Sequence, residues 1–129
     1  MIEWNDQLYL GHKALDDHHK EMVHAANLLY AAHRAGTREA VLSHLHALIA
    51  ASTEHFVFEE ELMAQMKYPK ALVHTEHHGE VLAQLNRFFD RVIANNVGDA
   101  DKVLAFLREW LTSHLVTFDR DLVRFMSRP

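Results

Sequence analysis

The sequence lacks cysteine and contains few of the residues that dominate tight turns. Among its 129 residues there are no cysteines, four glycines and two prolines. Without thiols the chain cannot form disulfides, iron–sulfur clusters or thiolate zinc sites. The scarcity of glycine and proline argues against an all-β fold, which needs many turns. A chain without disulfides suits a reducing compartment, and we expect a cytoplasmic protein.

Long hydrophobic runs and an excess of positive charge are also missing. No stretch of 18 apolar residues exists, so we expect no membrane insertion. Residues 1–10 carry acidic and polar groups, which is not the pattern of a signal peptide. The formal charge of −5 and the lack of a basic stripe argue against nucleic acid as a partner. Apolar residues make up 49% and charged residues 24%, which favours a single globular domain over residues 1–129.

Four amphipathic stretches with helical spacing of apolar residues fill most of the chain. They predict helices over about residues 12–35, 38–66, 69–95 and 99–126, preceded by an N-terminal arm over residues 1–11. Gly36 suits the end of the first helix, and Pro69 suits the first turn of the third. Because the connections are short, we predict an all-α, up-down-up-down antiparallel four-helix bundle. Trp4 and Tyr9 should pack the arm on the bundle, and no outward apolar stripe demands an oligomer, so we expect a monomer.

Histidine is abundant, with 12 residues, and several histidines lie on helix faces that are otherwise mostly apolar. The polar residues on these inward stripes are His19, His55, Glu59, His74, His78 and His114. In antiparallel helices these positions all fall at one end of the bundle, within a few turns of each other. A buried carboxylate needs a partner, and neutral imidazoles with carboxylates suit iron, zinc or manganese. The pattern therefore predicts a metal site at that end.

Asp119 could add a second carboxylate, but its spacing from His114 is unusual. Five residues on an ideal α-helix turn Asp119 about 140° away from His114. The apolar pattern then resumes at Leu122 and Met126. A π-bulge would absorb this one-residue skip, and such bulges are frequent at functional sites. We therefore predict a π-bulge over residues 114–119.

Read in order, these residues resemble the hemerythrin family, most closely its single-domain bacteriohemerythrins. The resemblance covers essentially the whole chain. The matching segments are Trp4-Asn5-Asp6, Leu15-Asp16-Asp17-His18-His19-Lys20, His55-Phe56-Val57-Phe58-Glu59-Glu60 with Met63, Tyr68-Pro69 with His74 and His78, and Trp110-Leu111-Thr112-Ser113-His114 with Asp119.

The resemblance implies a non-haem di-iron centre that binds dioxygen reversibly, for oxygen storage, delivery or sensing. Glu59 and Asp119 would bridge the two iron ions together with an oxo or hydroxo group. One iron would be held by His74, His78 and His114, and the other by His19 and His55. The two-histidine iron would keep an open position for dioxygen. An oxygen-consuming enzyme or a reductase would be a fitting partner.

Several residues near the predicted site have more than one interpretation. His18 could replace its neighbour His19 as the ligand, but the stripe favours His19 and leaves His18 facing solvent or orienting a ligand. Asp16 could orient His19 or cap the first helix. We expect Leu111 and Leu115, which flank His114, to line an oxygen pocket, and the alternative is that they are ordinary core leucines.

The remaining histidines and acidic residues are expected to have no role in the metal site. The histidines expected to be surface or ordinary residues are His12, His24, His33, His44, His46 and His77. Glu60 and Glu61 are expected to face solvent, whereas the methionines of the helices should fill the core: Met22, Met63 and Met66.

Three alternative functions remain beside the oxygen carrier, which would not be an enzyme. The first is a di-iron redox enzyme: an oxidase, a peroxidase or a protein that handles nitric oxide. Ferritin-like enzymes use paired Glu-x-x-His motifs, whereas Glu21-x-x-His24 stands alone here. The second is an iron or oxygen sensor, which would normally carry a signalling domain that this sequence does not show. The third is a structural zinc or manganese bundle.

Overall fold

The computed structural model describes residues 2–96, 98 and 100–128. Met1, Val97, Asp99 and Pro129 are outside the described residues, and so are the predicted start of the fourth helix at residue 99 and both ends of the predicted domain. Within the described part of the chain, no helix is long and apolar enough to cross a membrane.

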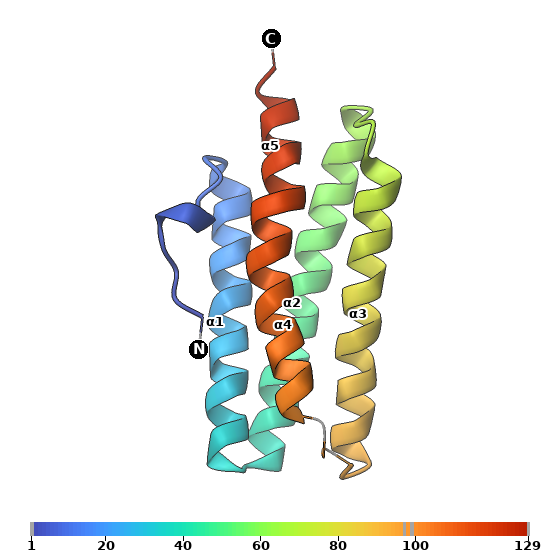
Figure 1. The fold of residues 1–129 in the computed structure, drawn as a ribbon. Coiled ribbons are helices and arrows are strands. Elements are labelled where there is room, and N and C mark those ends of the chain that lie inside the picture. The colour runs from blue at the N-terminus through green and yellow to red at the C-terminus, as the bar shows by residue number, and fades with distance from the viewer. Residues whose placement is uncertain (1, 97, 99, 129) are drawn as a thin grey trace.

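The helices pack antiparallel in a four-helix bundle, as Figure 1 shows. In chain order, a short 3₁₀ turn and the helices cover η1 (Asp6–Leu8), α1 (Lys13–Ala35), α2 (Arg38–Gln65), α3 (Ala71–Ile93), α4 (Ala100–His114), a π-helical segment (Leu115–Asp119) and α5 (Arg120–Met126). The α4 helix, the π-helical segment and α5 form one continuous column, which is the fourth helix of the bundle. The predicted all-α antiparallel bundle with a short N-terminal arm is confirmed, and so is the predicted π-bulge.

Local sequence signals explain how these helices begin and end. At the start of α1, the Nδ1 atom of His12 accepts a hydrogen bond from the backbone N–H of Leu15 at 3.3 Å. At its end, Gly36 adopts the left-handed conformation with φ of 73°, which glycine takes without steric cost. At the start of α2, Arg38 donates to the carbonyl oxygens of Val92 and Ile93, at 3.1 and 2.7 Å. This contact joins the beginning of α2 to the end of α3.

The N-terminal arm lies along α1 and is fastened to it at both ends. Ile2 and Asn27 exchange two hydrogen bonds, at 2.9 and 2.8 Å. At the other end, the Asp16 carboxylate accepts the backbone N–H groups of Leu10 and Gly11, at 2.8 and 3.2 Å. His12 is the N-cap of α1, and His19 Nδ1 has no hydrogen-bond partner within the described residues, so neither role considered for Asp16 is observed. Asp16 instead holds the arm.

The hydrophobic core has a large part and a small part, separated by the level of the predicted metal ligands. The large part, called the main core below, fills the bundle from the ligands toward the α1–α2 and α3–α4 connections, and includes Leu29, Leu45 and Leu48. The small part on the other side consists of Met63, Tyr68 and Leu122. Met66, predicted to fill the core, is only partly buried at the end of α2.

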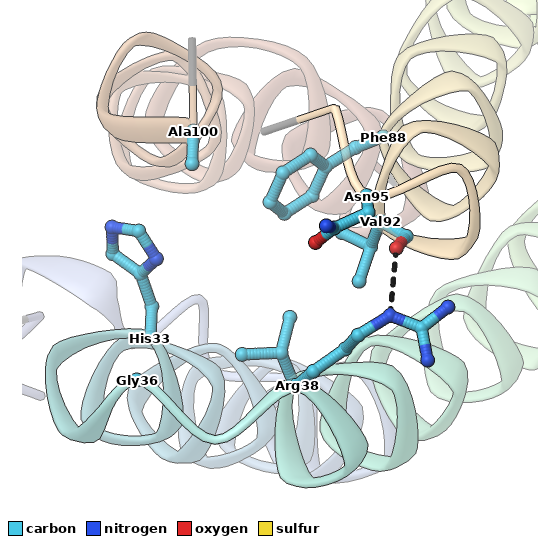
Figure 2. Close-up of a pocket in the computed structure, with 8 residues that line it drawn as sticks. His33, Gly36, Arg38, Phe88, Val92, Asn95 and Ala100 are labelled. Atoms are coloured by element: carbon cyan, nitrogen blue, oxygen red, sulfur yellow. Dashed lines mark hydrogen bonds between the residues drawn. The ribbon is translucent and has the colours of Figure 1, made fainter. Parts of the chain in front are cut away.

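A cavity of about 240 Å³ opens at the end of the bundle that lies away from the predicted ligands. Figure 2 shows the side chains around it, which come from the ends of α1 and α3 and the beginnings of α2 and α4. His33 lies at its edge, and its Nε2 atom is 3.0 Å from Asp101 Oδ1. As expected, His33 is therefore separate from the other inward histidines.

Candidate metal centre

The structure brings all seven predicted ligand side chains together inside the bundle. They come from every helix of the bundle and are each at most 1% exposed: His19, His55, Glu59, His74, His78, His114 and Asp119. Because α1 and α3 run opposite to α2 and α4, the early residues of one pair meet the late residues of the other (Figure 1). Helical spacing and antiparallel packing thus produce one cluster from positions spread over 100 residues, His19 to Asp119.

The cluster divides into two groups that share both carboxylates. In one group, Glu59 and Asp119 lie with His74, His78 and His114. In the other, the same two carboxylates lie with His19 and His55. Within each group one potential ligand atom per residue lies within 4.8 Å of all the others. Such a set can hold two metal ions side by side with the carboxylates between them.

The distances show how closely the imidazoles approach the shared carboxylates. Asp119 Oδ1 lies 2.9 Å from His74 Nε2 and 2.8 Å from His114 Nε2. Its other oxygen, Oδ2, lies 2.7 Å from His19 Nε2 and 3.3 Å from His55 Nε2. One carboxylate therefore presents a different oxygen to each group, which is the arrangement a bridging ligand needs.

Many of these close atoms make no hydrogen bond within the described part of the chain. Glu59 Oε1 lies 3.0 to 3.3 Å from the Nε2 atoms of His55, His74 and His78, yet neither Glu59 oxygen has a hydrogen-bond partner. Four more buried atoms also lack a hydrogen-bond partner within the described residues: His74 Nε2, His78 Nε2, His114 Nε2 and Asp119 Oδ1. Buried polar groups are normally hydrogen-bonded, so a converging set that is not bonded requires another partner. Imidazole nitrogens and carboxylate oxygens are ligands for first-row metals, so the residues present fit a metal pair.

The π-helical segment explains how Asp119 reaches the cluster. It occupies the five residues between His114 and α5, where an ideal α-helix would turn Asp119 away. In the structure Asp119 is 0% exposed and contacts His114 and His19. Leu115, at the start of the segment, and Leu111 are each 1% exposed, so both leucines flank His114 inside the protein.

Two residues outside the predicted ligand set contact the Nδ1 atoms of histidines within it. His18 is half-buried, and its Nδ1 atom lies 3.3 Å from His55 Nδ1, which agrees with an orienting role rather than a solvent-facing one. Glu60 Oε2 lies 3.2 Å from His78 Nδ1. The expectation that Glu60 faces solvent holds only in part, because its side chain is 37% exposed but also reaches from α2 to His78 on α3. Such contacts fix the orientation of a metal-binding imidazole.

His77 also differs from a plain surface residue. It is half-buried, and its Nε2 atom accepts a hydrogen bond from Trp110 Nε1 at 3.1 Å. Its ring stacks on the His114 ring with centroids 4.9 Å apart and on Phe118 at 4.4 Å. Spacing within one helix could not have indicated these contacts of His77, because they join α3 to α4 and to the π-helical segment. His24 and His46 are exposed, as expected.

Burial and mutual contact shift the pKa values of the cluster in opposite directions. Burial lowers the pKa of His55, but the nearby Asp119 and Glu59 carboxylates outweigh this effect and raise the pKa to about 9. The same opposing effects raise the pKa of His74 to about 9. Burial raises the pKa of Asp119, but the charge of the adjacent His114 ring holds it well below its usual range. Without metal, protonated His55 and His74 therefore lie beside ionised carboxylates near neutral pH, whereas burial lowers the pKa of His19.

Comparison with known proteins adds an independent observation. The model of a protein family described as "Hemerythrin HHE cation binding domain" matches residues 10–125. A bacteriohemerythrin from Pseudomonas paraeruginosa is 31% identical over 123 residues, which cover 95% of this chain and 79% of that protein. A bacteriohemerythrin from Ralstonia nicotianae is 26% identical over 128 residues, covering 99% and 90%. A myohemerythrin from Sipunculus nudus is 26% identical over 116 residues, covering 90% and 86%.

Proposed function

The chain belongs to the hemerythrin family, and on that premise we propose that it binds dioxygen reversibly at a non-haem di-iron centre. The role would be storage, delivery or sensing of oxygen rather than catalysis. The ligands in this proposal are the seven clustered side chains: His19, His55, Glu59, His74, His78, His114 and Asp119.

The observation that carries the proposal is the unequal size of the two groups that share Glu59 and Asp119. One group offers five side chains and the other four. Two metal ions held there would not be equally enclosed by the protein. The ion beside His19 and His55 would keep one more position open for an external ligand. An unequal pair suits a protein that binds a small ligand at one ion while the other ion stays enclosed.

Iron is the metal we propose, because it can exchange electrons as well as bind. Zinc has no redox chemistry, and carboxylate-rich oxygen sites favour magnesium, calcium or manganese. Two iron ions held by these residues would supply the two electrons that dioxygen takes up on binding and returns on release. The residues of the chain contribute the geometry of the pair and the surroundings that keep this exchange reversible.

The surroundings proposed to protect the exchange are apolar. Leu111 and Leu115 flank His114 and are each 1% exposed, so we propose that they line the oxygen pocket. Phe56 is also 1% exposed and stacks on the His78 ring with centroids 4.0 Å apart. An apolar shell of this kind excludes water and limits proton access to the centre. Limited proton access would disfavour irreversible reduction of the oxygen.

The test is a cycle of reduction, oxygenation and oxygen removal. The iron-loaded protein is reduced without oxygen, exposed to air and then returned to an oxygen-free atmosphere, with the visible spectrum recorded at each step. We expect absorption bands that appear with oxygen and fade on its removal, and two iron ions per chain. Bands that never fade would contradict a reversible carrier. Failure to load iron would overturn the whole proposal.

The alternative with most support is a di-iron redox enzyme, because the same residues could hold iron for that purpose. The seven protein ligands would fill the centre more completely than oxygen activation requires. A continuous uptake of oxygen in the presence of a reductant would favour the enzyme, whereas uptake that stops at one molecule per iron pair favours the carrier. A reductase or an oxygen-consuming enzyme remains the partner we propose for the carrier.

A further inference from the structure

Ser52 is a buried polar residue whose hydroxyl has no hydrogen-bond partner in the described part of the chain. Its side chain is 0% exposed, and its Oγ atom has no hydrogen bond within the described residues. The next residue makes the contrast clear, because the exposed Thr53 donates its Oγ hydrogen bond to the carbonyl oxygen of Ile49 at 2.8 Å. Hydroxyl groups on helices commonly use the carbonyl four residues earlier in this way. A buried hydroxyl that remains unbonded is costly and needs an explanation.

The position of Ser52 relates it to the metal centre. It lies three residues before His55 and seven before Glu59, so the three side chains share the inward face of α2. Three residues of helix correspond to about 4.5 Å, so Ser52 lies one turn from the level of the ligands. Ser52 lies on the main-core side of the predicted ligands and not on the side of the small cluster of Met63, Tyr68 and Leu122.

The other helices place apolar residues at the same level. Met22 follows His19 by three residues, Val81 follows His78 by three, and Leu111 precedes His114 by three. Given the directions of the helices, each of these steps leads to the same side of the ligands as Ser52 (Figure 1). All are at most 1% exposed, and they belong to the main core. The positions three residues below the predicted ligands thus carry one apolar side chain on each of three helices and a hydroxyl on α2.

We propose that Ser52 is a binding residue for the external ligand of the two-histidine half of the centre. Its hydroxyl donates a hydrogen bond to a small acceptor bound there, either dioxygen or a small anion such as azide. Ser52 shares α2 with His55, which belongs to the group that offers only four side chains. A donor in an otherwise apolar layer favours ligands that carry negative charge, since hydrogen bonds to charged acceptors are the stronger ones. This inference rests on the proposed di-iron centre but not on reversible oxygen binding.

The first test measures azide affinity in the oxidised, iron-loaded protein. Azide is the probe, followed by its visible absorption, in wild type, Ser52→Ala, Ser52→Thr and the control Thr53→Ala. We expect about five- to tenfold weaker binding in Ser52→Ala, which is the effect of one lost hydrogen bond. Ser52→Thr, which retains the hydroxyl, and Thr53→Ala should bind like wild type. Equal affinity in Ser52→Ala and wild type would overturn the proposal.

The second test needs no metal. Because the hydroxyl has no hydrogen-bond partner among residues 2–96, 98 and 100–128, metal-free Ser52→Ala should melt at the same temperature as wild type or above it. A melting temperature lower by several degrees would identify the hydroxyl as a structural group and overturn the proposal. If wild type loads iron but never releases oxygen, the proposed function fails, while the azide comparison still decides on Ser52.

Discussion

Two adjoining regions of the bundle interior are equally buried but contain opposite kinds of side chain. In the main core, hydrophobic residues such as Leu29, Leu45 and Leu48 are 0% exposed. One turn or more above them, seven histidines and carboxylates are at most 1% exposed. Burial of the leucines stabilises the fold directly. Burial of the polar residues does so only when a partner satisfies them.

The comparison teaches that the two regions perform separable tasks. The main core supplies the stability that holds the four helices in register. In the layer of the seven predicted ligands, called the ligand layer below, that register brings together nitrogen and oxygen atoms that lack hydrogen-bond partners within the described residues. Substitutions in one region should therefore change stability with little effect on metal content, and substitutions in the other should do the reverse.

The largest effect is expected for Glu59→Ala. Glu59 belongs to both groups, so its removal should lose most of the metal from both positions. Metal analysis of the purified protein measures the loss, and circular dichroism checks that the helices remain. Glu61→Ala, in the same helix but exposed, is the matched control and should keep the wild-type content. An unchanged two-metal content in Glu59→Ala would show that the assignment of this residue is wrong.

Leu45→Ala should show the opposite pattern. Leu45 is 0% exposed in the main core, ten residues before His55. Truncating a buried leucine costs about 2–5 kcal/mol, depending on how far the surroundings collapse. Denaturant unfolding of the metal-free protein measures this loss, and metal analysis at low temperature should still find two metals per chain. If Leu45→Ala loses metal but keeps its stability, the two regions do not perform separable tasks.

Glu60→Gln tests the contact that surrounds the ligand layer rather than the layer itself. The carboxylate of Glu60 lies 3.2 Å from His78 Nδ1 and should hold that ring in its metal-binding orientation. Loss of such a contact typically weakens metal affinity about 10–100-fold. Competition with a chelator measures the change, and Glu61→Gln serves as the control. If Glu60→Gln and Glu61→Gln bind metal with equal affinity, the contact of Glu60 with His78 does not support metal binding.

The last prediction concerns pH rather than a substitution. In the metal-free protein the pKa values of His55 and His74 are raised to about 9, so both imidazoles carry protons near pH 7.5. Metal must displace these protons, and its apparent affinity should fall about tenfold per displaced proton for each unit that the pH falls below 9. Adding ferrous iron without oxygen to a weakly buffered solution at pH 7.5 should release protons, which a pH electrode detects. Metal uptake without proton release would contradict this account.

The fold and the cluster could be predicted because both depend on spacing within single helices. Apolar periodicity indicated the helices, and His55 with Glu59 or His74 with His78 share a face at a separation of four. The spacing of His114 and Asp119 fitted no α-helix, and that misfit itself indicated the π-helical segment. The ligand roles of these residues stay predictions until metal is measured.

The residues that were misjudged act across elements, where spacing gives no information. Asp16 binds the backbone of Leu10 and Gly11 because the chain turns back at Gly11, which has a φ of 84°. Glu60 reaches α3, and His77 reaches Trp110 on α4. Ser52 lies on the inward face of α2, but spacing could not indicate that its hydroxyl has no hydrogen-bond partner within the described residues.

The π-helical segment also shows how a helix in a bundle can accommodate one additional residue. One residue fewer between His114 and Asp119 would place the carboxylate four residues after His114 and Leu122 three after that, which is an ordinary α-helical stripe. The segment thus has the form of a one-residue insertion. An insertion in an α-helix would rotate everything beyond it by about 100°. Here the π turn confines the disturbance to five residues, so α4 and α5 both keep their buried faces. Gaps in alignments are usually assigned to loops, but in this bundle a gap can belong in the middle of a helix.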